Sequence, residues 1–119
     1  MARVRVALRH ASQGQSETDL QFESKGLVVN FERRLVTLNG FEVRLTPIEF
    51  KLVAELARHA GKVLTHHHLL RQVWGPAYED STHTLRVHMG SVRRKIEPDP
   101  SRPQFIRTET GVGYRLLTE

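Results

Sequence analysis

Three helix-forming segments follow one another with only short links between them, and this succession constrains the fold more than any other feature of the sequence. The first opens at Thr46-Pro47-Ile48-Glu49, because threonine can cap a helix, proline suits the first helical position and the glutamate completes a capping box. Gly61 ends this segment, as glycine commonly does. Thr65 can cap the second segment, which Gly75-Pro76 ends.

The third segment has the clearest apolar face. Asp80 or Ser81 can cap it, and it runs to about Glu97, where Pro98 and Pro100 prevent its continuation. With successive side chains about 100° apart, its apolar residues fall on one side, which we expect to face the core. They are Leu85, Met89, Val92 and Ile96. The apolar stripes of the other two segments are Ile48, Leu52, Val53, Leu56 and Ala60, and then Leu69, Leu70, Val73 and Trp74.

Strand-forming residues lie on both sides of the helices. Before them, Asn39-Gly40 is the strongest signal for a two-residue hairpin, since both residues tolerate a positive φ. The expected strands are 27–31, 35–38 and 41–45, with 20–22 as a candidate edge strand, and then 105–109 and 114–117 around a glycine-rich tip at 110–113. Residues 63–64 form a short extended link. The sequence therefore predicts an α+β fold with a small antiparallel sheet, a three-helix core and a C-terminal β-hairpin.

This order of elements is that of a winged helix-turn-helix domain, in which the hairpin is the wing. The chain has a net charge of +5 and a pI of about 10.2, which favours a polyanionic partner. The third helix carries four cations and one acidic residue, so its net charge is positive. They are Arg86, Arg93, Arg94 and Lys95, and Glu97. A helix fits the major groove of DNA, and arginine can bind a guanine edge with two hydrogen bonds. A solvated cationic face at a helix C-terminus explains the same charges, because the helix dipole favours them.

We predict a DNA-binding surface on the side of the third helix away from its apolar face, together with the wing. The residues expected to contact DNA are His83, Arg86, Val87, Gly90, Ser91, Arg93, Arg94, Thr108 and Thr110. Those expected on the phosphate backbone are His66, Arg107 and Arg115, and the edge or backbone of Trp74 can also touch DNA. Trp74 is also a candidate core residue, and small residues such as Gly90 allow the helix backbone to approach the bases.

Several other functions find little support. There is no cysteine, no apolar run long enough to cross a bilayer, and no nucleophile elbow, P-loop or paired-carboxylate motif. We therefore expect a cytoplasmic protein that is not an enzyme, with no cofactor and no membrane partner. His66, His67 and His68 suggest a metal, but consecutive imidazoles diverge and no acidic ligand is evident nearby, so we predict no metal site. Two alternatives stay open: a basic module that binds an acidic protein, and a metal-responsive DNA binder that uses these histidines.

The motifs of this chain resemble the effector domain of OmpR/PhoB-type response regulators over about residues 20–117. They are Leu45-Thr-Pro-Ile-Glu-Phe50, Gly61-Lys-Val-Leu-Thr65, Leu69-Leu-Arg-Gln-Val-Trp-Gly75, Leu85-Arg-Val-His-Met89, Val92-Arg-Arg-Lys-Ile96 and Thr108-Glu-Thr-Gly-Val-Gly-Tyr-Arg115. Within that family, the combination is most similar to regulators of a potassium-transport operon. Some relatives carry arginine at the positions of Gly90, Ser91 and Thr110, which shifts the recognition expected here to Arg86, Arg93 and Arg94.

The resemblance implies an architecture and partners that composition does not show. Residues 2–9 look like the last helix of a receiver domain and 10–19 like a flexible linker, so the winged-helix domain would be 20–119. A sensor kinase would act only through the receiver domain, which is absent from this sequence. Family members bind direct repeats of DNA as head-to-tail dimers, and the loop at 75–80 contacts RNA polymerase. We expect the isolated domain to be a monomer.

Overall fold

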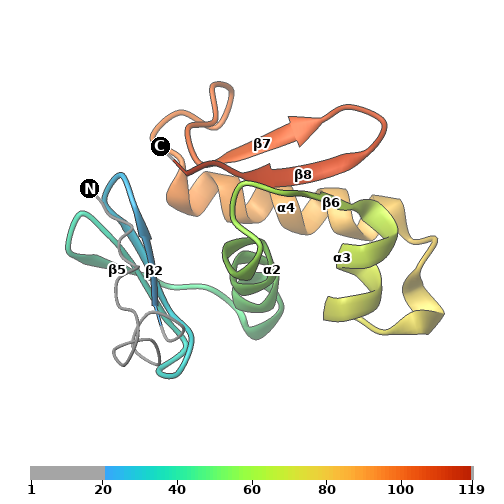
Figure 1. Cartoon of the computed structure of the whole chain (residues 1–119), viewed down its shortest axis with the longest axis horizontal. Helices are drawn as coiled ribbons and strands as arrows, with labels where there is room; N and C mark the ends of the chain where they lie inside the picture. Colours follow the sequence, from blue (N-terminus) through green and yellow to red (C-terminus); the bar gives the residue numbers. More distant parts are fainter. Residues whose placement is uncertain (1–20, 119) are drawn as a thin grey trace. The chain divides into compact units, whose positions relative to one another are not determined.

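A computed structural model of the chain describes residues 21–118 (Figure 1). These residues form two compact units, 21–44 and Leu45–Thr118. The predicted receiver-helix remnant and linker, residues 1–19, lie outside the described residues. Every helix within residues 21–118 is too short or too polar to cross a lipid bilayer.

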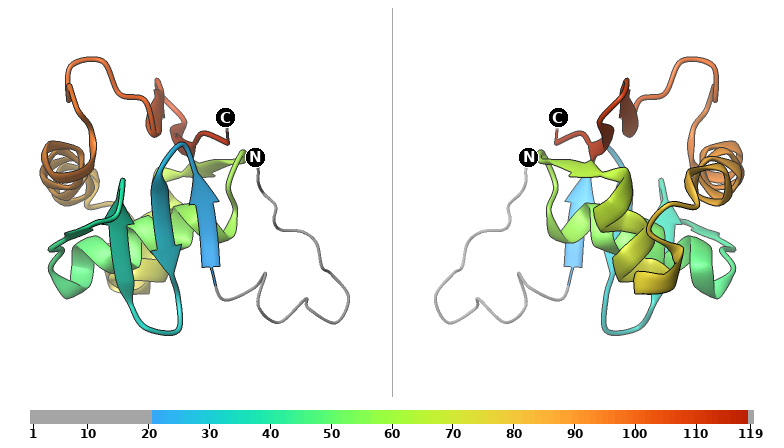
Figure 2. Two further views of the ribbon diagram at one scale, coloured as in Figure 1. Left: turned by 90° about the vertical axis from the view of Figure 1, so that its left-hand side faces the viewer. Right: turned by 90° about the vertical axis from the view of Figure 1, so that its right-hand side faces the viewer.

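The first unit is a four-stranded antiparallel sheet, and Figure 2 shows its strands side by side. Its strands are β2 (Gln21–Ser24), β3 (Leu27–Asn30), β4 (Leu35–Leu38) and β5 (Phe41–Val43), paired in that order. Asn39 and Gly40 join β4 to β5 with φ angles of 52° and 87°, which confirms the predicted hairpin turn. Lys25-Gly26 makes a turn with similar positive φ values between β2 and β3, and this turn was not predicted.

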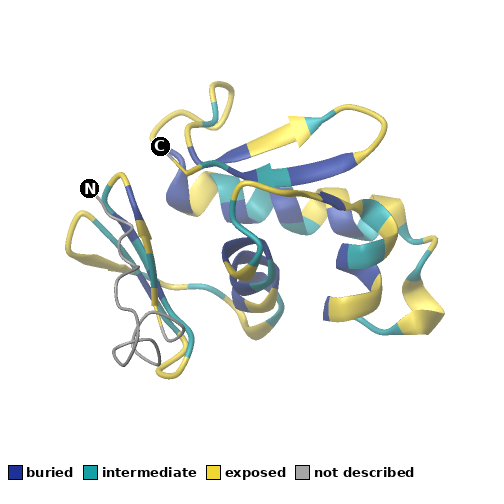
Figure 3. Ribbon diagram, viewed as in Figure 1, coloured by how far each residue is buried: buried dark blue, intermediate teal, exposed yellow. Residues whose placement is uncertain are grey.

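The second unit contains three α-helices, a short 3-10 helix and a three-stranded sheet. In chain order the elements are α2 (Pro47–Arg58), β6 (Val63–Thr65), α3 (His66–Val73), η1 (Pro76–Tyr78), α4 (Thr82–Ile96), β7 (Ile106–Glu109) and β8 (Gly113–Leu116). The predicted winged-helix order of elements is confirmed. The predicted apolar side of the third helix is also confirmed, because Leu85, Met89, Val92 and Ile96 of α4 are all buried (Figure 3).

Some local predictions were wrong. The extended backbone predicted at 63–64 is present, but its pairing was missed: it is part of β6, which pairs with β8, so the wing hairpin belongs to a sheet of order β6-β8-β7. A three-residue segment is too short to show strand periodicity, and only its pairing partner, about fifty positions later in the chain, reveals it. The first helix ends at Arg58, before Gly61, and the side chain of Ser81 makes no capping hydrogen bond to α4.

Glu49 links the start of α2 to α4. It is only 4% exposed, and it completes the predicted capping box, because its Oε1 accepts a hydrogen bond from the Thr46 backbone N–H at 2.9 Å. From α4, the Lys95 ammonium donates to the same oxygen at 2.6 Å, and the Ser91 hydroxyl donates to Oε2 at 2.5 Å. Burial alone would raise the pKa of Glu49, but the hydrogen bonds from Lys95, Ser91 and Thr46 outweigh it and lower the pKa from 4.5 to about 2.

Gly113 allows β8 to lie directly against β6. It is paired with Thr65 of β6 and Glu109 of β7, and a Cβ atom at this position would lie 1.8 Å from the carbonyl oxygen of Leu64. No side chain fits at that distance. The glycine therefore decides how closely the wing packs onto the strand that leads into α3.

We predict that Glu49→Gln lowers the stability of the protein at neutral pH and makes its free energy of unfolding less dependent on pH in the acidic range. The folded pKa of about 2 lies below the unfolded value, so the unfolded chain binds the proton more readily. The carboxylate's stabilisation, on the order of 3 kcal/mol, is thus fully present above about pH 5 and is lost as the pH falls towards about 2. Urea unfolding across this range would measure it, with the exposed Glu32→Gln as the matched control. Equal pH profiles for the two variants would contradict the prediction.

We predict that Gly113→Ala destabilises the protein by about 1–3 kcal/mol, because the Cβ displaces the backbone of β6 or β8. Gly90→Ala is the matched control, since a Cβ there meets only Arg94 Nη1, at 3.7 Å. In the interior of α4, that change should stabilise the protein by about 0.5–1 kcal/mol. Both values follow from urea unfolding, and a Gly113→Ala variant as stable as the natural chain would refute the close approach.

Candidate nucleic-acid interface

The side of α4 away from the core carries exposed residues. His83, Arg86, Val87 and Arg94 are exposed, and Val87 keeps 51% of its surface accessible although it is apolar. His83 and Val87 are four residues apart, as are Arg86, Gly90 and Arg94, so the exposed residues form two adjacent rows along the helix. Gly90 lies between them, where a Cβ would have open space apart from the Arg94 guanidinium. These five residues were expected at the interface, and the structure places them together on one accessible face.

Ser91 points away from this face. It was grouped with the predicted DNA-contacting residues, but its hydroxyl donates its hydrogen bond to Glu49 of α2. Lys95, one turn further along the helix, contacts the same carboxylate. The side of α4 that carries Ser91 and Lys95 therefore contacts α2 through Glu49, although Lys95 stays exposed. The sequence-based placement of Ser91 on the outward side was wrong. Helical periodicity alone gave no means of seeing that a buried acid on another helix would take up this hydroxyl.

Arg93 also departs from the expected outward strip, because it connects α4 to the wing. Its Nη2 donates to the backbone carbonyl of Ile106 at 2.9 Å and to the Thr108 hydroxyl at 2.7 Å. The guanidinium carbon lies 5.5 Å from the centre of the Tyr114 ring, within the range of a cation–π contact. Arg93 thus contacts both strands of the hairpin, which runs along α4 in Figure 1.

The wing carries two arginines on facing strands. Arg107 of β7 is the register partner of Arg115 of β8, and like charges in such a pair repel. Glu109 relieves this repulsion: its Oε2 lies 2.9 Å from Arg115 Nη2 and 3.7 Å from Arg107 Nε. The Arg107 side chain remains 61% exposed and that of Arg115 30% exposed, so Arg107 is the more accessible cation of the pair. Beyond them, Thr108, Thr110 and Val112 are exposed around the tip.

The beginning of α3 adjoins the wing. The backbone N–H of His66 donates to the carbonyl of Val112 at 3.2 Å, and its ring meets the ring of Tyr114 edge to face. Trp74 caps the other end of α3, where its half-buried ring contacts the ring of His88 at a centroid distance of 5.1 Å. Both His66 and Trp74 keep some accessible surface. Trp74 is at once a packing residue and a partly accessible surface residue, which agrees with both of its sequence-based interpretations.

The net charge of the third helix does not all reach this face. Lys95 is paired with Glu49, and Arg93 is bound to the wing. Glu97 is 5% exposed and accepts hydrogen bonds from the backbone N–H groups of residues 104–106, at the start of β7. Arg86 and Arg94 are left as the exposed cations on the outward face of α4. A charge count along the sequence cannot separate these cations from those used within the fold.

The three consecutive histidines have three different neighbours. His66 contacts Tyr114, His67 Nε2 lies 3.7 Å from Asp80, and His68 Nε2 lies 2.6 Å from Glu55. The three side chains point in different directions, as expected for consecutive residues of a helix. The assumption that no acidic ligand lies nearby was wrong, because Glu55 comes from α2, thirteen positions earlier in the chain.

The sequence of this chain is similar to those of known transcriptional regulators. Residues 40–116 match the family described as "Transcriptional regulatory protein, C terminal". The chain is 47% identical over 116 residues to the KDP operon transcriptional regulatory protein KdpE of Escherichia coli K12. It is 41% identical over 116 residues to the transcriptional regulatory protein KdpE of Mycobacterium tuberculosis H37Rv. Each alignment covers 98% of this chain and 51% of the relative, so the chain spans about half the length of these curated relatives.

Solved structures of similar proteins have the same fold. The response regulator DrrB of Thermotoga maritima, an OmpR/PhoB homologue, superposes with a TM-score of 0.76 at 32% identity, covering 87% of this chain and 46% of that one. The DNA-binding domain of Klebsiella pneumoniae RstA, solved in complex with the RstA box, superposes with a TM-score of 0.75 at 27% identity, covering 82% of this chain and 96% of that one. The chain therefore belongs to the OmpR/PhoB-type family of C-terminal winged-helix domains, the DNA-binding output domains of response regulators.

Proposed function

We propose that this domain binds promoter DNA with α4 in the major groove and the wing on the adjacent backbone or minor groove. The observation that carries the proposal is the exposed stripe on α4, in which Arg86 and Arg94 flank Gly90. Arginine at these positions can reach base edges or phosphates, and the absence of a side chain at Gly90 lets the helix approach closely. In the wing, Arg107 and Thr110 would also contact DNA, and His66 and Trp74 are proposed phosphate contacts.

Arg93 has a different role in this proposal. Its guanidinium already binds Ile106 and Thr108, so it orients the wing relative to α4 and does not read a base. Thr108 shares its hydroxyl with Arg93 and would contact DNA from that fixed position. Ser91 and Arg115 likewise act through Glu49 and Glu109, respectively, by holding α4 and the wing in place.

The relatives suggest the regulated gene and the wider assembly. KdpE of Escherichia coli is named as a regulator of the KDP operon, and we extend regulation of a potassium-transport operon to this chain. RstA binds the RstA box, and we propose that this domain also recognises a defined DNA site, as head-to-tail copies on a direct repeat. The isolated domain would be a monomer, and a sensor kinase would act through a receiver domain. Residues 75–80, mostly exposed around η1, would contact RNA polymerase. A role on the bacterial chromosome implies a cytoplasmic protein.

Selection of bound sites from a pool of random duplexes tests the proposal directly, since the operator sequence need not be specified beforehand. An enriched common motif supports sequence-specific binding. A basic module for an acidic protein partner would enrich no motif, and unlabelled duplex would not compete for it.

We predict that Arg94→Ala weakens binding to the selected duplex without lowering stability. Loss of a base contact should cost about 1–3 kcal/mol on that duplex only, whereas loss of a phosphate contact should weaken all sequences alike and reduce the salt slope by about one. Arg71→Ala on α3 removes an equal charge and serves as the control.

Arg93→Ala should instead lower the free energy of unfolding by about 1–3 kcal/mol, because it removes charged hydrogen bonds to the wing. Unchanged affinity after replacing Arg86 and Arg94 together would eliminate this surface.

We predict that Gly90→Ala separates stability from binding. The free protein should become more stable, because alanine is the better helix former, while the added methyl group holds the helix away from the bases. Affinity for the selected duplex should fall, whereas affinity for unrelated duplexes, which depends on phosphate contacts, should change much less. Fluorescence anisotropy at matched salt measures both. Full affinity in the stabilised variant would show that α4 does not approach DNA at Gly90.

A further inference from the structure

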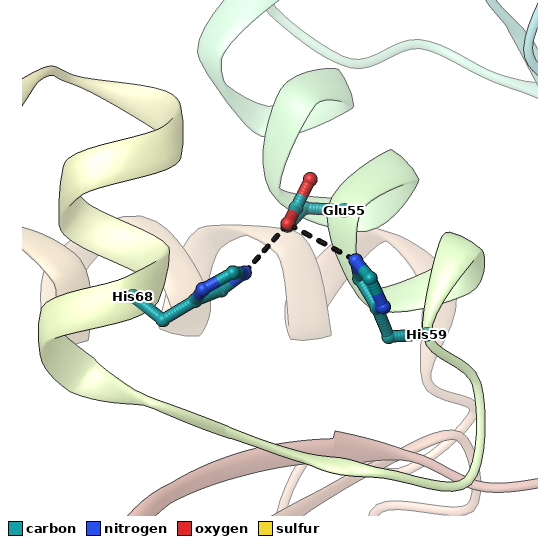
Figure 4. Close-up of side chains that lie close together, drawn as sticks. All are labelled: Glu55, His59 and His68. Carbon is teal, nitrogen blue, oxygen red and sulfur yellow. Dashed lines mark hydrogen bonds and ion pairs between the residues drawn. The ribbon is translucent and has the colours of Figure 1, made fainter.

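Glu55, His59 and His68 bring three metal-ligating groups together where the end of α2 meets the beginning of α3 (Figure 4). Glu55 Oε2 lies 3.4 Å from His59 Nε2 and 2.6 Å from His68 Nε2. The three ligand atoms all lie within 4.8 Å of one another. Figure 4 shows both imidazole rings directed at the same carboxylate oxygen. None of these residues belongs to the DNA-binding surface proposed above.

The separations are close to those of a tetrahedral zinc site. Zinc binds histidine nitrogen at about 2.0–2.1 Å and carboxylate oxygen at about 2.0–2.2 Å, which places neighbouring ligand atoms about 3.3–3.5 Å apart. The pair formed by Glu55 and His59 already has this spacing. The pair formed by Glu55 and His68 would open by less than about 1 Å to admit an ion. Two histidines and one glutamate form a known zinc ligand set, with a fourth position for water.

The backbone holds each ligand in place. Glu55 and His59 are four residues apart, so they share one side of α2. His59 caps the end of that helix, and its backbone N–H donates to the carbonyls of Leu56 and Ala57. His68 lies in the first turn of α3, where its N–H donates to the capping Thr65 hydroxyl at 3.0 Å. Only the side chains would need to adjust. A ligand set held by two capped helix ends loses little conformational entropy when an ion binds.

The surroundings leave the site accessible. The glutamate side chain is 13% exposed, whereas those of His59 and His68 are 41% and 36% exposed. His68 also lines an open hollow of about 480 Å³ with His67, Arg71, Gln72 and Glu79, which opens the His68 side of the cluster to solvent. The neighbouring cation, Arg58, lies 3.9 Å from the other carboxylate oxygen, Oε1, and leaves Oε2 to the two histidines.

We propose that Glu55, His59 and His68 bind a divalent transition-metal ion of the zinc class and that the ion ties α2 to α3. This differs from a site on the histidine run, because only His68 of that run takes part and His67 faces Asp80. The proposal is independent of DNA binding, so either can fail without the other. When an ion binds the folded state alone, it raises the midpoint of thermal unfolding to an extent set by its affinity and concentration.

The test uses the full chain without an affinity tag. Zn²⁺ titrated by calorimetry should bind with one ion per chain, and the melting temperature should rise with Zn²⁺ but not with Mg²⁺. His59→Gln and His68→Gln should each weaken Zn²⁺ binding by more than the roughly 10- to 100-fold typical of losing an outer partner of a ligand. His67→Gln removes a more exposed histidine of the same run and should bind as the natural chain does. Circular dichroism without metal would establish that each variant folds.

Co²⁺ supplies a second measurement, because a four-coordinate site with nitrogen and oxygen ligands gives the ion much stronger visible absorption than six-coordinate Co²⁺ has. That absorption should appear with the natural chain and with His67→Gln and be absent from a His59→Gln, His68→Gln double variant. Equal binding by the double variant, or loss of binding in His67→Gln, would overturn the assignment. So would a natural chain that binds neither ion, which would leave Glu55 and the two histidines as a helix-to-helix ion-pair cluster.

Discussion

The buried carboxylate of Glu49 is the interaction on which the position of α4 depends. A charge removed from water is tolerated only when its lone pairs are satisfied, and here the partners come from two helices: Thr46 on the α2 side, and Ser91 and Lys95 from α4. Rotating or sliding α4 would leave the carboxylate without those partners. The same contact that stabilises the helical core therefore sets which side of α4 faces outward.

Adjacent arginines on α4 show how strongly that orientation separates similar residues. Arg93 and Arg94 differ by one helical step, yet Arg93 is bound to Ile106 and Thr108 while Arg94 is exposed on the outward stripe. The wing is also held from its other side, because Gly113 brings β8 against the backbone of Leu64. Helix and wing are thus fixed to each other, as a binding surface built from two elements requires.

Much of the site could be predicted from the sequence. The apolar spacing of Leu85, Met89, Val92 and Ile96 already implied an opposite side with Val87 and Arg94, flanked by Arg86, because one period governs both. Three of the errors have a common origin. Ser91 and the acidic neighbour of His68 were misjudged because each depends on a glutamate of α2 that is distant in sequence, and β6 was missed because its partner is β8. Local periodicity carries no information about such pairings.

Capping residues, turn residues and apolar periods are local properties, so the sequence alone determined the three helices, the Asn39-Gly40 turn, the order of elements and the family. Tertiary structure decided which polar and charged side chains remain available: Arg93, Ser91, Lys95 and Glu97 are used within the fold, and Arg86 and Arg94 are exposed. It also assembled Glu55, His59 and His68. The physical reason is that a hydrogen bond or an ion pair extends only a few ångströms, so it depends on which segments the fold brings together and not on their separation along the chain.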